Sequence, residues 1–197
     1  MKSEIKNIRV KRELKTNNKF KVSTTKRFLA YLIDNIVLAL LYAIPMNYIY
    51  SLITKKIEKK ITLDMFELSY ALIIFTICLF ISFYYLIYIP VYKSPGKTIG
   101  KRAFGIKVVK EDGSNPDFKT MFIREAIGVI LLEGATYPIS GYAYNLVGML
   151  TEPNIEKILT YIFGIITAIS VMYALINKNN AMFHDRIAKT KVISIKN

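Results

Sequence analysis

The sequence predicts an all-α membrane protein with four transmembrane helices and a small cytoplasmic β element. Three observations predict it: four long apolar blocks, a strongly uneven distribution of basic residues along the chain, and two short segments rich in β-branched residues. About 20 apolar residues cross the hydrocarbon core of a bilayer. Each block is long enough, and the predicted spans are 28–53, 68–92, 126–150 and 158–177.

The four blocks differ in how well they suit a continuous helix. The second and fourth contain no charged residue, whereas the first contains Asp34 and the third contains Glu133. The third block also contains Pro138 and several glycines, so it is either a kinked span or two shorter helices broken near Pro138. Irregular backbone at membrane depth must lie against protein or water. If the block were re-entrant and did not cross, the C-terminus would lie outside, against the five basic residues there, so a crossing is favoured.

Basic residues predict the orientation of the chain. The formal net charge is +14, and 23 of the 28 Lys and Arg residues lie before the first block, between the second and third, or after the fourth. An excess of positive charge marks cytoplasmic segments, so both termini are predicted to be cytoplasmic, with residues 1–22 as a basic cytoplasmic segment. The same residues favour a bilayer with anionic headgroups as the partner, and not nucleic acid.

Two segments outside the blocks have the composition of β-strands. Ile106–Lys110 is followed by an Asp-Gly turn, and the end of the chain is similarly β-branched. We expect strands at about 105–110 and 189–195 to pair beneath the membrane. Because two strands alone are marginally stable, they are expected to pack against the helix ends.

A basic, glycine-containing turn follows the second block. It comprises Gly96, Lys97, Gly100, Lys101 and Arg102. A phosphate-binding loop would need a glycine where Val91 stands, and a strand where an apolar span precedes the turn. We therefore expect a tight turn at the headgroups, with its cations facing phosphates or a carboxylate.

Arg27 and Asp34 are the most informative residues of the first block. They are seven residues apart, so they share one helix face, with Asp34 about 10 Å deeper. Arg27 is expected to anchor the start of the helix at the interface. Asp34 either takes up a cation or a proton or forms a structural pair with a base, the candidates being Lys97, Lys101, Arg102 and Arg124.

Glu133 is the second buried acid. If it faces Asp34, the two form an ion- or proton-binding pair, or a structural one. If it lies near an interface, it is a solvated residue at a helix end.

Histidine and cysteine, which commonly form catalytic and metal-binding sites, are scarce. His184 is the only histidine and Cys78 the only cysteine, so we expect no disulfide, no metal, no cofactor and no enzymatic activity. Asp185 is expected to tie the final loop onto the turn at 97–102.

Three motifs, taken in order, resemble the RDD family of bacterial membrane proteins, which is named for one arginine and two aspartates. They are Arg27 with Asp34, the segment Pro95–Val109 with Asp112-Gly113, and His184–Thr190. The resemblance covers about residues 25–193 and assigns the family positions to Arg27, Asp34 and Asp185. Lys189 departs from the pattern, where a small residue or glycine is expected.

The resemblance implies an RDD-type membrane domain over 23–197, multi-pass in the bacterial cytoplasmic membrane. It implies a transport role, with ion or proton exchange through an intramembrane carboxylate such as Asp34. Because four spans without an internal repeat make a small bundle, a pathway would require a homo-oligomer. The alternative is a non-transporting accessory, regulatory or immunity-type protein that acts on another membrane protein.

Overall fold

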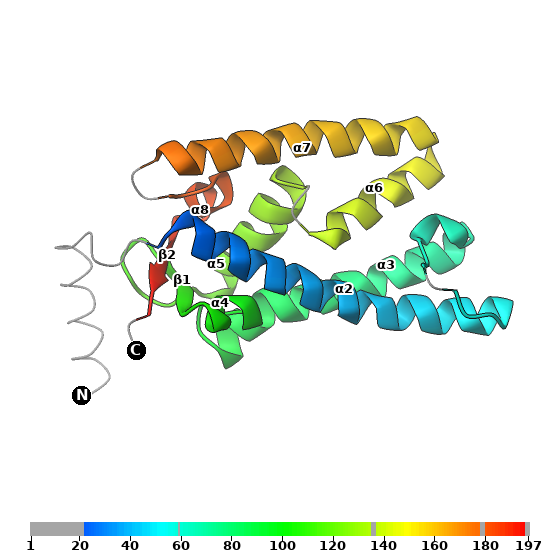
Figure 1. Cartoon of the computed structure of the whole chain (residues 1–197), viewed down its shortest axis with the longest axis horizontal. Coiled ribbons are helices and arrows are strands. Elements are labelled where there is room, and N and C mark those ends of the chain that lie inside the picture. The colour runs from blue at the N-terminus through cyan, green and yellow to red at the C-terminus, as the bar shows by residue number, and fades with distance from the viewer. Residues whose placement is uncertain (1–21, 59, 135–136, 178–179, 196–197) are drawn as a thin grey trace.

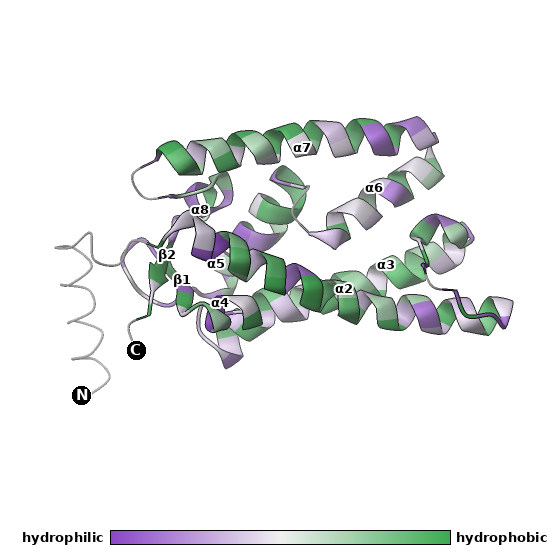
Figure 2. Ribbon diagram, viewed as in Figure 1, coloured by the Kyte–Doolittle hydropathy of each residue, from purple (hydrophilic) through white to green (hydrophobic). Residues whose placement is uncertain are grey.

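The computed structural model describes residues 22–58, 60–134, 137–177 and 180–195, so the predicted basic segment 1–22 lies almost wholly outside it. Three of its helices are long and apolar enough to cross a membrane. They are α2 (Thr24–Thr54), the continuous helix formed by α3 (Leu68–Phe83) and η3 (Tyr84–Lys93), and α7 (Pro153–Ile176). Figure 2 shows hydrophobic residues along most of α2 and α7. The first, second and fourth predicted blocks therefore form long apolar helices.

The remaining elements are short. They are η2 (Leu63–Met65), α4 (Ile99–Ala103), β1 (Ile106–Lys110), α5 (Phe118–Phe122), η4 (Ile123–Leu132), α6 (Pro138–Leu150), α8 (Phe183–Ile187) and β2 (Thr190–Ser194).

The block predicted at 126–150 is not one continuous helix. It comprises most of η4, which ends at Leu132, and then α6, whose first turn holds Pro138. This is the second of the two alternatives, two shorter helices. Proline suits the first turn of a helix because its missing N–H has no partner there. In Figure 1, α5 lies near the sheet, and α6 leads from the middle of the molecule toward its far end.

Helix α2 forms the long axis of the core. The Oγ of Ser23 caps its start by accepting a hydrogen bond from the N–H of Lys26 at 3.3 Å. Every fourth residue from Ala30 to Tyr50 is buried, which forms a single stripe that includes Asp34. Within that stripe, the hydroxyl groups of Tyr42 and Ser82 are 2.5 Å apart, which joins α2 to α3. The rest of α2 presents large apolar side chains outward, as a helix in lipid does.

The predicted strands pair. Strands β1 and β2 are antiparallel, with Ile106 opposite Ser194 and Lys110 opposite Thr190. Figure 1 places this two-stranded sheet at one end of the molecule, with α4, α8 and the start of α2. Ile106 is buried with Ala30 of α2, so the sheet is held against the helix end as expected.

Candidate functional site

Two clusters of buried polar residues lie toward the end of the molecule that holds the sheet. The Asp34 cluster consists of Asp34, Tyr85, Thr98, Gly100 and Lys101. The Arg124 cluster consists of Arg27, Arg124, Glu125, Glu133, Ser170, His184 and Asp185. Each joins elements that are far apart in the sequence.

Asp34 is fully buried and accepts hydrogen bonds on both carboxylate oxygens. Its Oδ1 accepts from the hydroxyl of Tyr85 at 2.5 Å and from the N–H of Gly100 at 2.8 Å. Its Oδ2 accepts from the hydroxyl of Thr98 at 2.6 Å and lies 3.6 Å from the Nζ of Lys101. The carboxylate therefore joins α2 to η3 and to the start of α4.

Gly100 allows this arrangement because α4 approaches the backbone of α2 very closely. A Cβ at Gly100 would lie 2.0 Å from the carbonyl oxygen of Ala30 and 2.9 Å from Oδ1 of Asp34. Only glycine brings the N–H of residue 100 within reach of the carboxylate.

The basic turn divides its cations between two environments. Lys101 is buried and faces Asp34, as one of the four candidate partners. Arg102 is exposed, and its guanidinium donates to the Oγ of Ser94 at 2.9 Å. Lys97 is half-buried, and the buried carbonyl of Gly96 accepts from the N–H of Val108 at 2.8 Å.

Asp185 lies at the centre of the Arg124 cluster, between two arginines. Its Oδ2 pairs with the guanidinium of Arg27, and its Oδ1 accepts from Arg124 at 3.0 Å. The sequence-based expectation that Asp185 ties the final loop onto the turn at 97–102 is therefore wrong, because Asp185 pairs with Arg27 and Arg124 instead. Arg27, at the start of α2, points inward to Asp185, a buried carboxylate that offers it a desolvated partner.

The charges around Asp185 keep it ionised. Burial by itself raises the pKa of this carboxyl, but the neighbouring guanidiniums of Arg27 and Arg124 hold its pKa well below the usual range. Oδ2 also accepts from the N–H of Met182 at 3.1 Å, which caps α8. Asp185 thus joins α8 to the start of α2.

Glu133 and His184 form the other half of this cluster. Nδ1 of His184 lies 2.8 Å from Oε2 of Glu133. Oε1 of Glu133 accepts from the N–H of His184 at 3.0 Å and from the Oγ of Ser170 at 2.7 Å. Asp34 and Glu133 therefore have different sets of partners, and the structure does not bring them together as one pair.

The geometry of η4 explains how Arg124 and Glu133 reach the same neighbour. They are nine residues apart, which is two and a half turns of an α-helix and would put them on opposite faces. η4 is a π-helix, and the N–H of Glu133 bonds to the carbonyl of Gly128, five residues earlier. Its wider turns make nine residues roughly two turns, so both side chains face α8.

Among the buried acids that the structure describes, Glu125 has the least complete set of hydrogen-bond partners. It is 1% exposed, and its Oε1 pairs with Arg124. Its Oε2 has no hydrogen-bond partner among the described residues, and neither has Nε of Arg124. A buried carboxylate oxygen without a donor is costly, so this atom is a place where a proton or a ligand would be stabilised.

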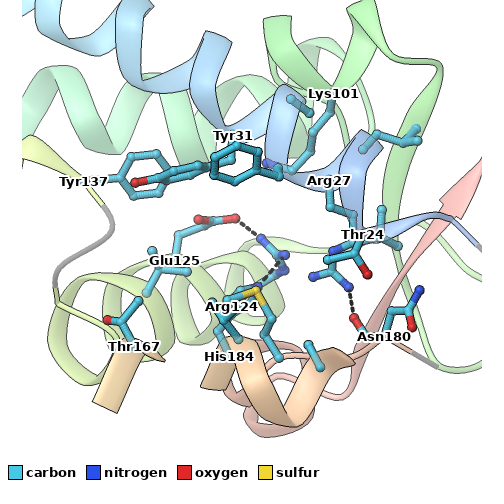
Figure 3. A pocket seen from close by; sticks show the side chains of 18 residues that line it. Thr24, Arg27, Tyr31, Lys101, Arg124, Glu125, Tyr137, Thr167, Asn180 and His184 are labelled. Carbon is cyan, nitrogen blue, oxygen red and sulfur yellow. Dashed lines mark hydrogen bonds and ion pairs between the residues drawn. The ribbon is translucent and has the colours of Figure 1, made fainter. Parts of the chain in front are cut away.

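A cavity of about 290 Å³ lies beside Glu125, between α2, η4, α7 and α8. Figure 3 shows the Glu125 carboxylate between the rings of Tyr31 and Tyr137 on one side and Arg124 on the other. The polar residues that line the cavity include Arg27, Lys101, Glu125 and His184, so it adjoins both clusters.

Sequence reasoning singled out Arg27, Asp34 and Asp185 but missed Glu125, Tyr85 and Thr98. Glu125 precedes the third apolar block and reads there as an interfacial residue. Only the inward turn of η4 buries it. Among the described residues, no group of three or more His, Cys, Asp or Glu side chains is arranged to hold a metal ion.

Comparison with known proteins identifies a family whose model matches most of the chain. Neither the search of curated proteins nor that of solved structures gives a match. The model of the RDD family matches residues 21–189, which includes Arg27, Asp34 and Asp185. A chain with three long apolar helices that matches over this range is a membrane protein, and it belongs to the RDD family.

Proposed function

We propose that this protein takes up a proton or a small cation at Glu125, as the binding step of ion or proton exchange across the membrane. The observation that carries the proposal is the unpartnered Oε2 of Glu125, which is buried beside the 290 Å³ cavity.

Asp34, the acid that the sequence favours for exchange, is a poorer candidate. Three donors and the ammonium of Lys101 surround it, and they stabilise its charged form in one geometry. A group that exchanges ions must release them, and a carboxylate held this tightly has little to gain from a further cation. We therefore assign Asp34 a structural role.

The charges of the Arg124 cluster support uptake of a positive charge. The cluster has two guanidiniums, Arg27 and Arg124, and three carboxylates, Glu125, Glu133 and Asp185. Counted over these guanidiniums and carboxylates, one negative charge is in excess, and a proton or a bound cation at Glu125 balances it.

The proposed topology has four crossings with both termini cytoplasmic, the third crossing being formed by η4 and α6 together. We expect cysteines placed by Glu58→Cys and Asn154→Cys to react with an impermeant thiol reagent outside intact cells. Those placed by Asp112→Cys and Ser194→Cys are expected to react only after permeabilisation. Cys78 is buried and serves as the internal control. External labelling at position 194 contradicts four crossings.

The exchange activity is testable in proteoliposomes. We expect an imposed gradient of protons or monovalent cations to drive flux through the wild-type protein. Glu125→Gln is expected to reduce that flux at least tenfold, because a neutral amide takes up no proton near neutral pH and carries no negative charge to attract a cation. Glu67→Gln, at an exposed acid before α3, is the matched control and is expected to retain the flux.

The accessory role is the second candidate, and one observation favours it. Among the residues of α7, only Ser170 and Ala174 are buried, so most of this helix faces outward, toward lipid or another membrane protein. The absence of flux under every gradient, together with a membrane protein that co-purifies at fixed stoichiometry, would replace exchange with this role.

A further inference from the structure

We infer that the cavity beside Glu125 binds an apolar molecule that carries an ammonium group, with the ammonium at Oε2 of Glu125. The inference rests on the proposed function in so far as both assign Glu125 the binding of positive charge. It goes further by naming the class of molecule that the cavity fits.

The walls of the cavity are mostly apolar. Phe28, Ala30, Val129, Val171, Ala174 and Met182 line it. Small-molecule sites typically have such walls with a few polar groups that fix orientation, and about 290 Å³ is at the small end of their range. An inorganic ion would leave these walls bare, whereas a short hydrocarbon group fills them.

The polar groups of the cavity select a cation. Oε2 of Glu125 needs a hydrogen-bond donor, which an ammonium supplies. Tyr31 and Tyr137 line the cavity beside it with ring centroids 5.5 Å apart, and aromatic faces attract cations. Three basic residues line the cavity, and each already faces a carboxylate: Arg124 faces Glu125 and Asp185, Arg27 faces Asp185, and Lys101 faces Asp34. The Nε–H of Arg124, which has no partner among the described residues, suits an oxygen next to the ammonium.

The exposed members of the wall indicate where a ligand enters. Phe28 is 56% exposed and Val171 is 38% exposed, and both belong to long apolar helices. An entrance between α2 and α7 therefore opens toward the bilayer. Two sources have the required chemistry: a free alkylamine dissolved in the membrane, and the headgroup of an ethanolamine phospholipid.

Binding is measured on the purified full chain in a neutral detergent, with hexylamine, hexanol and hexanoate as probes. These have similar size and differ in charge. We expect hexylamine to raise the unfolding temperature by several degrees at saturation, since a ligand that binds only the folded state stabilises it. Hexanol and hexanoate are expected to give at most a small part of that shift. Equal shifts from all three would overturn the inference.

Three variants locate the site. Glu125→Gln is expected to weaken hexylamine binding at least tenfold. Val171→Phe, which places a ring at the entrance and leaves Glu125 intact, is expected to do the same. Leu175→Phe, on the same helix at a position that does not line the cavity, is expected to bind hexylamine as the wild type does. Undiminished binding by Val171→Phe, in a protein that remains folded, also overturns the inference.

The source is distinguished by repeating the titration in lipid nanodiscs. Competition by ethanolamine phospholipid, but not by choline phospholipid, assigns the site to the headgroup. Hexylamine binding that is equal in both lipids assigns it to a free amine. The binding assay also separates this inference from the proposed function. Ammonium binding without flux removes the exchange activity and keeps the site, whereas flux without ammonium binding does the reverse.

Discussion

Replacing Asp185 by asparagine is expected to lower the free energy of unfolding by about 3–5 kcal/mol, the cost of leaving a buried charge without its partner. Asp185 is fully buried and pairs with both Arg27 and Arg124. The amide keeps the shape of the side chain but removes the negative charge between the two guanidiniums. The loss is measured by equilibrium unfolding in mixed detergent micelles.

Asp117→Asn is the matched control, because Asp117 pairs with Lys110 on the surface. The side chains of this pair are 57% and 31% exposed, so water screens their attraction and the expected loss is no more than about 1 kcal/mol. Equal losses from the two variants would show that the pairing of Asp185 adds nothing to the stability of the fold.

The contribution of Asp185 to the free energy of unfolding depends on pH with a definite sign. The pKa of Asp185 is lowered in the folded state, so its contribution is fully present above the unfolded value of 3.8 and is lost only as the pH falls below it. We therefore expect the stability difference between the wild type and Asp185→Asn to stay constant from pH 8 to pH 5. It narrows only as the pH falls below about 4. A difference that narrows between pH 8 and pH 6 is incompatible with this assignment.

The long helices and the sheet were predictable because their signals are local. An uninterrupted apolar run of sufficient length has few alternatives to a span, and β-branched segments at 106–110 and 190–194 favour strands. The block around Pro138 was predictable only as two alternatives. Whether the chain bends or breaks there depends on what packs around Glu133, which is tertiary information.

The partners within the site were not predictable for a geometric reason. Pairing of Arg27 with Asp185 brings together residues 158 positions apart. The spacing of Arg124 and Glu133 also misleads, because an α-helical projection separates them and the π-helix aligns them. Four basic residues were candidate partners of Asp34, and Lys101 is the one that lies beside it. The closer partners of Asp34 are Tyr85, Thr98 and the N–H of Gly100. These groups are uncharged, so a search of the sequence for basic partners does not find them.

Substitution of Asp34 by asparagine tests whether this acid has a structural role or lies in the pathway of ion exchange. Asp34→Asn is expected to destabilise the protein by about 2–4 kcal/mol, because one carbonyl oxygen cannot accept from Tyr85, Gly100 and Thr98 together and Lys101 loses its counter-charge. The loss is measured by the same unfolding assay, with Asp64→Asn at an exposed acid as control.

A double-mutant cycle with Lys101→Met makes the interpretation specific. If Asp34 and Lys101 act as a pair, the two substitutions together lower the free energy of unfolding by less than the sum of their separate losses.

Asp34→Asn protein that remains folded is expected to retain cation or proton flux, because Glu125 is untouched. The opposite result, unchanged stability with flux abolished, would move the exchanging carboxylate from Glu125 to Asp34. A carboxylate surrounded by donors would then have to open during transport, with α4 separating from α2 at Gly100 to expose it.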